Sequence, residues 1–174
     1  MIKKIPQSAK VVIIGGGVAG CSVAYHLSKF GWNDIVLLER DQLTSGTTWH
    51  AAGLIGQLGS SATITKLRNH SLNLYKQLEK ETGLSTGLKQ NGSLTVATTE
   101  GRLQELKRQV TTAQLFNVES TEVSIEQIKS LYPLINTDDV IGGVYTPNDG
   151  QADPVGVTNV LAKAAKEQGA NFIE

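Results

Sequence analysis

Near its N-terminus the chain reads Val11-Val12-Ile13-Ile14-Gly15-Gly16-Gly17-Val18-Ala19-Gly20. The first four residues of this stretch form a short apolar run, which is typical of a strand buried on both faces of a parallel sheet. A helix is expected over Val18–Phe30, with Val23, Ala24 and Leu27 on one face and Gly31 at its end. A second buried strand is expected over Ile35–Glu39. The stretch therefore predicts an α/β fold that begins with a right-handed β-α-β unit.

The glycines of this unit follow the spacing G-x-G-x-x-G. The first allows a tight turn, the second lets the backbone approach a pyrophosphate, and the third lets helix and strand pack closely. Glu39, nineteen residues after Gly20, can accept hydrogen bonds from a ribose and would repel a 2′-phosphate. The spacing predicts dinucleotide binding but does not separate FAD from NAD. The expected contacts in this unit are Gly15, Gly17, Val18, Ala19, Gly20, Glu39 and Arg40.

Composition excludes several other classes of protein. The 174 residues are 40% hydrophobic and carry a formal net charge of zero, which permits a core and argues against non-specific nucleic-acid binding. A single cysteine, Cys21, excludes a disulfide framework and a Cys-rich zinc site. No run reaches the roughly 18 apolar residues of a membrane span. Only ten residues precede Val11, too few for a secretory signal, so we expect a soluble, cytoplasmic protein unless a precursor was trimmed.

The remainder of the chain alternates between strand and helix patterns. A helix is expected from about Ala62 to Glu81, with Ile64, Leu67, Ser71, Leu74 and Leu78 on one stripe. A strand over Leu94–Thr98 follows, then a helix marked by Leu103, Leu106, Val110 and Ala113, and a short helix capped by Ser124 and Gln127. The last expected elements are a strand over Val140–Tyr145, a helix from Asp153 to about Gln168 and a strand from Ala170. A doubly wound sheet needs a third strand beside the first, and the strand from Ala170 has barely begun. The chain therefore reads as the N-terminal piece of a longer protein.

The segment from Thr44 to Gly59 is rich in small and hydroxyl residues and has no clear period. A backbone of this kind can lie against a ligand and donate several hydrogen bonds. Its residue His50 can serve as a hydrogen-bond donor, a base or a nucleophile, and a surface histidine is an equal alternative on residue chemistry alone.

This segment resembles the flavin-attachment loop of the dimethylglycine dehydrogenase and sarcosine dehydrogenase family, within the wider D-amino-acid-oxidase-like flavoproteins. The family pattern G-[ST]-T-W-H-A-A-G-L is matched by Gly46, Thr47, Thr48, Trp49, His50, Ala51, Ala52, Gly53 and Leu54. The likeness continues through Gly92-Ser93-Leu94 and Tyr132-Pro133-Leu134 to Asp149-Gly150 and Asp153-Pro154. By this resemblance FAD is the cofactor, all nine loop residues contact it, and His50 bonds covalently to the flavin 8α-methyl group.

The resemblance also implies a domain plan and a reaction. Residues 1–90 would be the first part of a Rossmann-like FAD-binding domain, and residues 91–150 the start of an inserted α+β substrate-side region. Residues 151–174 would return to the FAD-binding domain. The reaction would be oxidation of a small N-methylated amino acid, such as dimethylglycine or sarcosine. Oxygen or an electron-transfer protein would accept the electrons, and a later domain could bind tetrahydrofolate. The alternatives are another flavin amine oxidase and a non-catalytic nucleotide-binding module.

The other chemistry-bearing residues have simpler interpretations. His26 and His70 lie within expected helices with no second ligand at metal spacing, so no metal site is expected. Cys21 is expected to be a small buried helix residue rather than a reactive thiol. Asp149 and Asp153 are expected in a turn and at a helix N-cap rather than as an acid–base pair. No catalytic residue is assigned, because in the family the substrate-binding residues come later in the chain.

Overall fold

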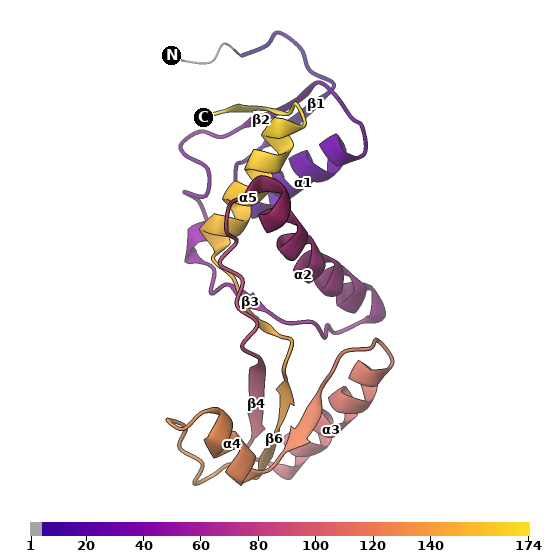
Figure 1. Ribbon diagram of the computed structural model, residues 1–174, viewed down its shortest axis with the longest axis vertical. Helices are drawn as coiled ribbons and strands as arrows, with labels where there is room; N and C mark the ends of the chain where they lie inside the picture. The colour runs from indigo at the N-terminus through magenta and orange to yellow at the C-terminus, as the bar shows by residue number, and fades with distance from the viewer. Residues whose placement is uncertain (1–4) are drawn as a thin grey trace. The chain divides into compact units, whose positions relative to one another are not determined.

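The first β-α-β unit forms where the glycine pattern predicts it. In a computed structural model, which describes residues 5–174, β1 spans Val11–Ile14, α1 spans Val18–Lys29 and β2 spans Ile35–Leu38 (Figure 1). The strands are parallel and in register from Val11 opposite Ile35 to Ile14 opposite Leu38. Gly31 follows the helix with φ of +82°, a conformation that favours glycine and ends α1 there.

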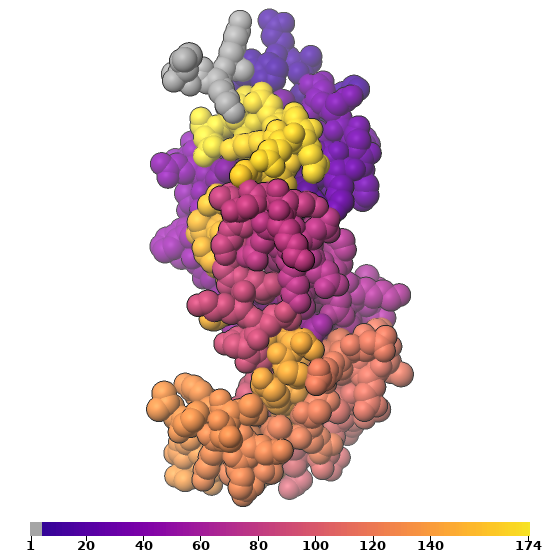
Figure 2. Space-filling model, viewed as in Figure 1, coloured from indigo at the N-terminus to yellow at the C-terminus, as the bar shows by residue number. Residues whose placement is uncertain are grey.

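The third strand of this sheet lies beside β2 and not beside β1, so the expected position of that strand was wrong. β8 (Asn171–Ile173) pairs in parallel with β2, which gives the order β1-β2-β8. The helix before it, α5 (Pro154–Glu167), packs against α1. Crossovers between parallel strands are almost always right-handed, and two such crossovers whose helices pack together place successive strands in the order observed here. The yellow C-terminal residues consequently pack among the early residues in Figure 2.

The expectation that β1 is buried on both faces was also wrong. Val12 is 52% exposed and Ile14 is 88% exposed, whereas Ile35, Val36 and Leu37 of β2 are buried. β1 is an edge of the sheet, and among the described residues nothing covers the face that carries Val12 and Ile14. The inner stripe of α1 likewise differs from the expected one. It consists of Cys21, Ala24, Tyr25 and Ser28, while Val23 is exposed.

The long helix α2 (Ala62–Thr82) is present as expected, although its buried stripe is shifted. Leu72, Leu74 and Leu78 are buried, but Leu67 is 58% exposed and Ile64 is also exposed. Near the end of α2, the Glu79 carboxylate accepts hydrogen bonds from the Thr86 N–H at 2.6 Å and the Thr86 hydroxyl at 2.7 Å. Lys163 Nζ of α5 donates to the Thr82 carbonyl at 2.7 Å. These bonds fix the end of α2 against the loop that follows it and against α5.

A second sheet is antiparallel and has the order β4-β6-β5. Its strands are β4 (Ser93–Ala97), β6 (Gly142–Thr146) and β5 (Thr121–Val123). The helix α3 (Glu100–Gln114) packs Leu106 against Ala97 and Val144 in a small core. The helix α4 (Ile125–Leu131) begins with the expected capping box between Ser124 and Gln127. A further two-stranded ladder joins β3 (Leu54–Ile55) to β7 (Gly150–Gln151).

The chain divides into two compact units. One consists of the residues up to Gly53, Asn73–Leu88 and Ala152–Glu174; the other consists of Leu54–Leu72 and Lys89–Gln151. The first unit holds the parallel sheet and the second holds the antiparallel one. Residues 1–4 of the expected cofactor region lie outside the described residues. No helix in residues 5–174 is long and apolar enough to cross a membrane.

Candidate functional site

The glycine loop between β1 and α1 is shaped by close backbone approaches. Gly15 has φ of +106°, which an L side chain rarely adopts, and its N–H donates to the Leu38 carbonyl at 2.8 Å. A Cβ on Gly20 would collide with the Gly15 carbonyl oxygen, and a Cβ on Gly17 would lie 2.9 Å from Thr48 Oγ1. The turn at Gly15 and the close packing at Gly20 are those that the sequence predicts, whereas Gly17 lies against the Thr48 side chain.

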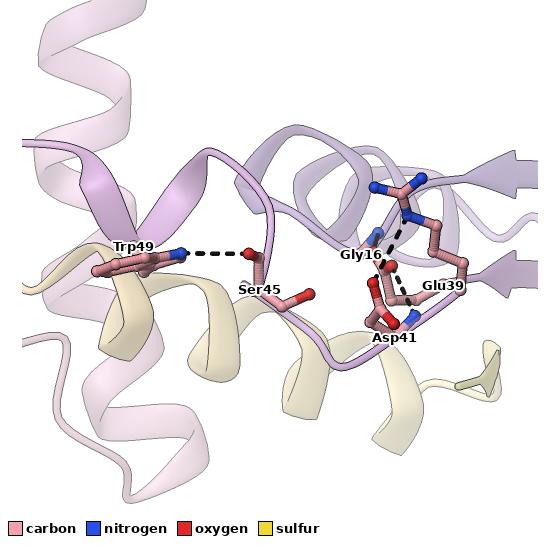
Figure 3. Close-up of polar contacts among 6 residues, drawn as sticks. Gly16, Glu39, Asp41, Ser45 and Trp49 are labelled. Atoms are coloured by element: carbon pink, nitrogen blue, oxygen red, sulfur yellow. Dashed lines mark hydrogen bonds and ion pairs between the residues drawn. The ribbon is translucent and has the colours of Figure 1, made fainter.

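The acid at the end of β2 binds this loop directly. One carboxylate oxygen of Glu39 accepts a hydrogen bond from the Gly16 N–H at 2.7 Å, and the other accepts from the Asp41 N–H at 3.1 Å (Figure 3). The hydrogen bond from Gly16, followed by the one from Asp41, holds the pKa of the Glu39 carboxyl below its usual range. The carboxylate is therefore ionised and positioned at the carboxyl edge of the sheet.

The N-terminus of α1 carries no negative charge of its own. Its N-cap is Gly17, which has no side chain to cap with, and its first turn contains no acidic residue. Thr48, which is buried, supplies the missing acceptor: its Oγ1 accepts from the Val18 N–H at 3.1 Å. Because this oxygen accepts from Val18, its own proton is available to donate elsewhere. The helix dipole and this hydroxyl together favour an anion at this point.

A pocket of about 400 Å³ opens between the glycine loop, the end of β2 and the loop after it. Its lining comprises Ile14, Gly15, Gly17, Leu38, Glu39, Arg40, Gly46, Thr47 and Thr48. Seven of these were predicted as cofactor contacts. Ile14 and Leu38 were not predicted as contacts. The sequence does hold a signal for both, because each is the last strand residue before a predicted contact. Among the other predicted contacts, Val18 joins the site through its N–H, and Ala19 and Gly20 lie in the first turn of α1.

The tryptophan–histidine pair lies in a single turn of 3-10 helix, Thr48–His50, which the sequence pattern does not predict. Trp49 Nε1–H donates to the Ser45 carbonyl at 3.2 Å, as Figure 3 shows. His50 Nδ1 lies 3.2 Å from the Gly46 carbonyl oxygen. Since a carbonyl only accepts, Nδ1 carries a proton in this contact, and in the neutral form of the ring the lone pair is therefore on Nε2.

The end of the loop is fixed at Gly53. Its φ is +70°, and its carbonyl accepts from the Ala152 N–H at 2.8 Å. A Cβ at this position would collide with the Ala152 carbonyl oxygen. Ala51 and Ala52 before it are exposed, and Leu54 after it belongs to the second compact unit and is 79% exposed.

The family is decided by a match to the model of the FAD dependent oxidoreductase family, DAO, over residues 10–174. The chain belongs to this family. Human mitochondrial sarcosine dehydrogenase is 47% identical over 173 residues, which cover 99% of this chain and 19% of that protein. Rat mitochondrial dimethylglycine dehydrogenase is 44% identical over 161 residues, or 92% of this chain and 19% of that protein. The chain thus spans about a fifth of the length of these relatives.

A solved structure resembles the chain closely. L-proline dehydrogenase from P. horikoshii has a TM-score of 0.90 and 30% identity, over 98% of this chain and 45% of that one. These comparisons bear out the resemblance and the α/β FAD-binding fold expected from the sequence. The expected cytoplasmic location gains no support from the two mitochondrial relatives.

The described residues fit FAD on physical grounds. A dinucleotide needs a close backbone approach at its pyrophosphate, donors for its phosphate oxygens and an acceptor for its ribose hydroxyls. The glycine loop provides the first, the N-terminus of α1 and Thr48 the second, and the ionised Glu39 the third. The pocket that they line lies at the carboxyl ends of β1 and β2, where parallel sheets bind nucleotides.

The remaining candidates mostly take the structural roles expected of them. Cys21 is fully buried, and burial raises the pKa of its thiol to about 12, which opposes reactivity. Asp153 caps α5 by accepting from the N–H groups of Val155 and Gly156. Among residues 5–174 no group of three His, Cys, Asp or Glu side chains is placed to hold a metal ion.

Asp149 does more than occupy a turn. Its buried carboxylate accepts from the Gln57 N–H at 2.8 Å and from the Ser93 hydroxyl at 2.7 Å. It therefore ties together three segments of the second unit, a role that the interpretation as a local turn missed.

Proposed function

We propose that this chain is the FAD-holding part of a flavoprotein that oxidises a small N-methylated amino acid, with sarcosine and dimethylglycine as the first candidates. Two observations support the proposal. Glu39 accepts a hydrogen bond from Gly16 and Thr48 accepts one from Val18 at the same pocket, and the sequence is 47% and 44% identical to a sarcosine and a dimethylglycine dehydrogenase. The flavin, when bound, would take a hydride from the N-methyl carbon of the substrate. The residues that hold the substrate are not among those assigned.

In this proposal the residues that line the pocket have separate tasks. Glu39 accepts hydrogen bonds from the adenosine ribose, and its negative charge disfavours a 2′-phosphate. The free N–H groups at the start of α1 and the Thr48 hydroxyl donate to the pyrophosphate. Arg40, Gly46 and Thr47 line the same pocket.

We further propose that His50 holds the flavin covalently. The geometry supports attachment through Nε2, because Nδ1–H is engaged by the Gly46 carbonyl. His50 would hold the flavin by a bond from Nε2 to its 8α carbon. Forming that bond releases one hydrogen from the imidazole and one from the methyl group, and the flavin would supply the two-electron oxidation that this requires. A fixed bond of this kind prevents loss of the cofactor.

The domain plan belongs to the same proposal. Residues 1–90 and 151–174 would contribute the FAD-binding part, and residues 91–150 the start of the substrate-side region. The electron acceptor would be oxygen or an electron-transfer protein, and a tetrahydrofolate-binding domain would lie outside this sequence. Cytoplasmic location stays a prediction.

The substrate class is tested by anaerobic titration of the purified full-length gene product. Sarcosine, dimethylglycine, glycine and proline are added in turn while the visible flavin absorbance is followed. Bleaching by sarcosine or dimethylglycine, with formaldehyde formed after air is admitted, is the expected result. Bleaching by glycine or proline alone would instead assign the chain to another amine oxidase of the family.

A further inference from the structure

Two neighbouring aromatic side chains, Trp49 and His50, are held in contact with each other. Their ring centroids lie 3.8 Å apart, with an angle of 36° between the planes. Each ring nitrogen bonds to a backbone carbonyl four residues earlier, Trp49 to Ser45 and His50 to Gly46. Both rings are thus folded back over the same turn, side by side.

Burial does not account for this arrangement. Trp49 is 57% exposed, and His50 is exposed as well, so the tryptophan contributes little to a core. An exposed histidine on a loop ordinarily samples several rotamers. The bond to Gly46 fixes the position of Nδ1 but lets the imidazole swing about the Nδ1–oxygen axis. The Trp49 ring lies against the imidazole and restricts that swing.

We propose that Trp49 is a positioning residue for His50, which holds the imidazole so that Nε2 points in one direction. This inference rests on the proposed attachment of flavin at His50. The lone pair of Nε2 lies in the plane of the imidazole, so the orientation of the ring decides where Nε2 can form a bond. The indole is itself anchored, because its N–H donates to Ser45. Trp49 therefore limits the movement of the imidazole by steric contact, and it takes no part in the bond between Nε2 and the flavin.

The test compares variants of the full-length gene product, produced without flavin and then mixed with FAD. Trp49→Ala removes the ring that contacts the imidazole, and Trp49→Phe keeps an aromatic ring but loses the hydrogen bond to Ser45. Trp32→Ala is the matched control, since Trp32 lies in the same compact unit and is 52% exposed. Acid-stable flavin fluorescence on denaturing gels gives the rate of attachment. Equilibrium binding to variants that also carry His50→Ala gives the affinity for non-covalent FAD.

We expect Trp49→Ala to slow attachment by about 10- to 100-fold, because misplacement of a reacting group costs this much. The affinity for non-covalent FAD should fall by a much smaller factor, because Trp49 is only one of the loop residues expected to contact FAD. The attachment rate of Trp49→Phe should lie between those of Trp49→Ala and the wild type, and that of Trp32→Ala should match the wild type. Attachment by Trp49→Ala at the wild-type rate would overturn the inference. A uniform loss of attachment and FAD affinity would also overturn it, since it would show a general structural role.

A second measurement addresses the imidazole itself. Carbon-13 relaxation of the labelled His50 ring in flavin-free protein, assigned with His50→Gln, reports how far the imidazole moves. The ring should be less mobile in the wild type than in Trp49→Ala, because the indole restricts the swing about the Nδ1–oxygen axis. Equal ring mobility in the two proteins would contradict the positioning role. A wild type that never acquires acid-stable flavin, by contrast, would overturn the attachment at His50 and this inference with it.

Discussion

The Glu39 carboxylate lies 2.7 Å from the backbone nitrogen of Gly16 and accepts its hydrogen bond. This contact joins the end of β2 to the loop between β1 and α1, 23 residues earlier in the chain. It orients the acid at the edge of the pocket, and it satisfies an N–H of the glycine loop. A single side chain thereby shapes the loop and offers its remaining lone pairs to a ligand.

Replacement of Glu39 by Gln should weaken FAD binding by about 10- to 100-fold, because a charged acceptor is exchanged for a neutral one. Isothermal titration of flavin-free protein carrying His50→Ala measures the affinity without the covalent bond. Glu100→Gln, an exposed change in the first turn of α3, is the control and should leave the affinity unchanged. An affinity unaltered by Glu39→Gln would remove the acid from the site.

Replacement by alanine should change the free energy of unfolding in opposite directions at two helical glycines. Gly20→Ala places a methyl group on the Gly15 carbonyl oxygen and should lower the free energy of unfolding by about 3 kcal/mol. Gly101→Ala in α3 meets open space and should raise it by about 0.5 kcal/mol. Urea denaturation of both variants measures the difference. Equal effects at the two positions would contradict the close packing at Gly20.

Thr48→Val should destabilise the protein by about 1–2 kcal/mol, because the Val18 N–H loses its buried acceptor while the shape is kept. Thr48→Ser retains the hydroxyl and should recover much of the loss. Thr47→Val changes an exposed neighbour and serves as the control. Thermal unfolding of the three variants checks the order; a Thr48→Val protein as stable as the wild type would show that the bond is dispensable.

The contribution of Glu79 to stability should depend on pH. Hydrogen bonds from the Thr86 hydroxyl and N–H hold the pKa of the Glu79 carboxyl below its usual range. A lowered folded-state pKa stabilises the protein above the unfolded-state value of about 4.3, and the gain is lost as pH falls through the folded-state pKa. Glu79→Gln should therefore lower the melting temperature at neutral pH and have progressively less effect in acid. A pH-independent difference would contradict the assignment.

Much of the first unit could be predicted because the causes are local. An apolar run, a glycine spacing and an acid at the end of the second strand are enough to place β1, α1 and β2. The capping box at Ser124 and the N-cap at Asp153 were likewise confirmed, since each depends on residues within one turn.

The errors arose where the outcome depends on distant residues. β8 pairs with β2 because α5 packs against α1, and nothing near Asn171 encodes that choice. The exposure of Ile14 follows from the position of β1 at an edge of the sheet, which strand composition does not reveal. Asp149 bonds to Gln57, 92 residues away, so its bridging role could not be predicted from the turn around it.

Acid precipitation and peptide mapping decide whether this chain holds FAD with His50 as its covalent anchor. The full-length gene product is precipitated with acid, washed, digested and analysed by mass spectrometry. We expect flavin to stay with the pellet and the peptide containing His50 to carry the mass of FAD. Flavin that washes entirely into the supernatant, or a modification on a different residue, would contradict it.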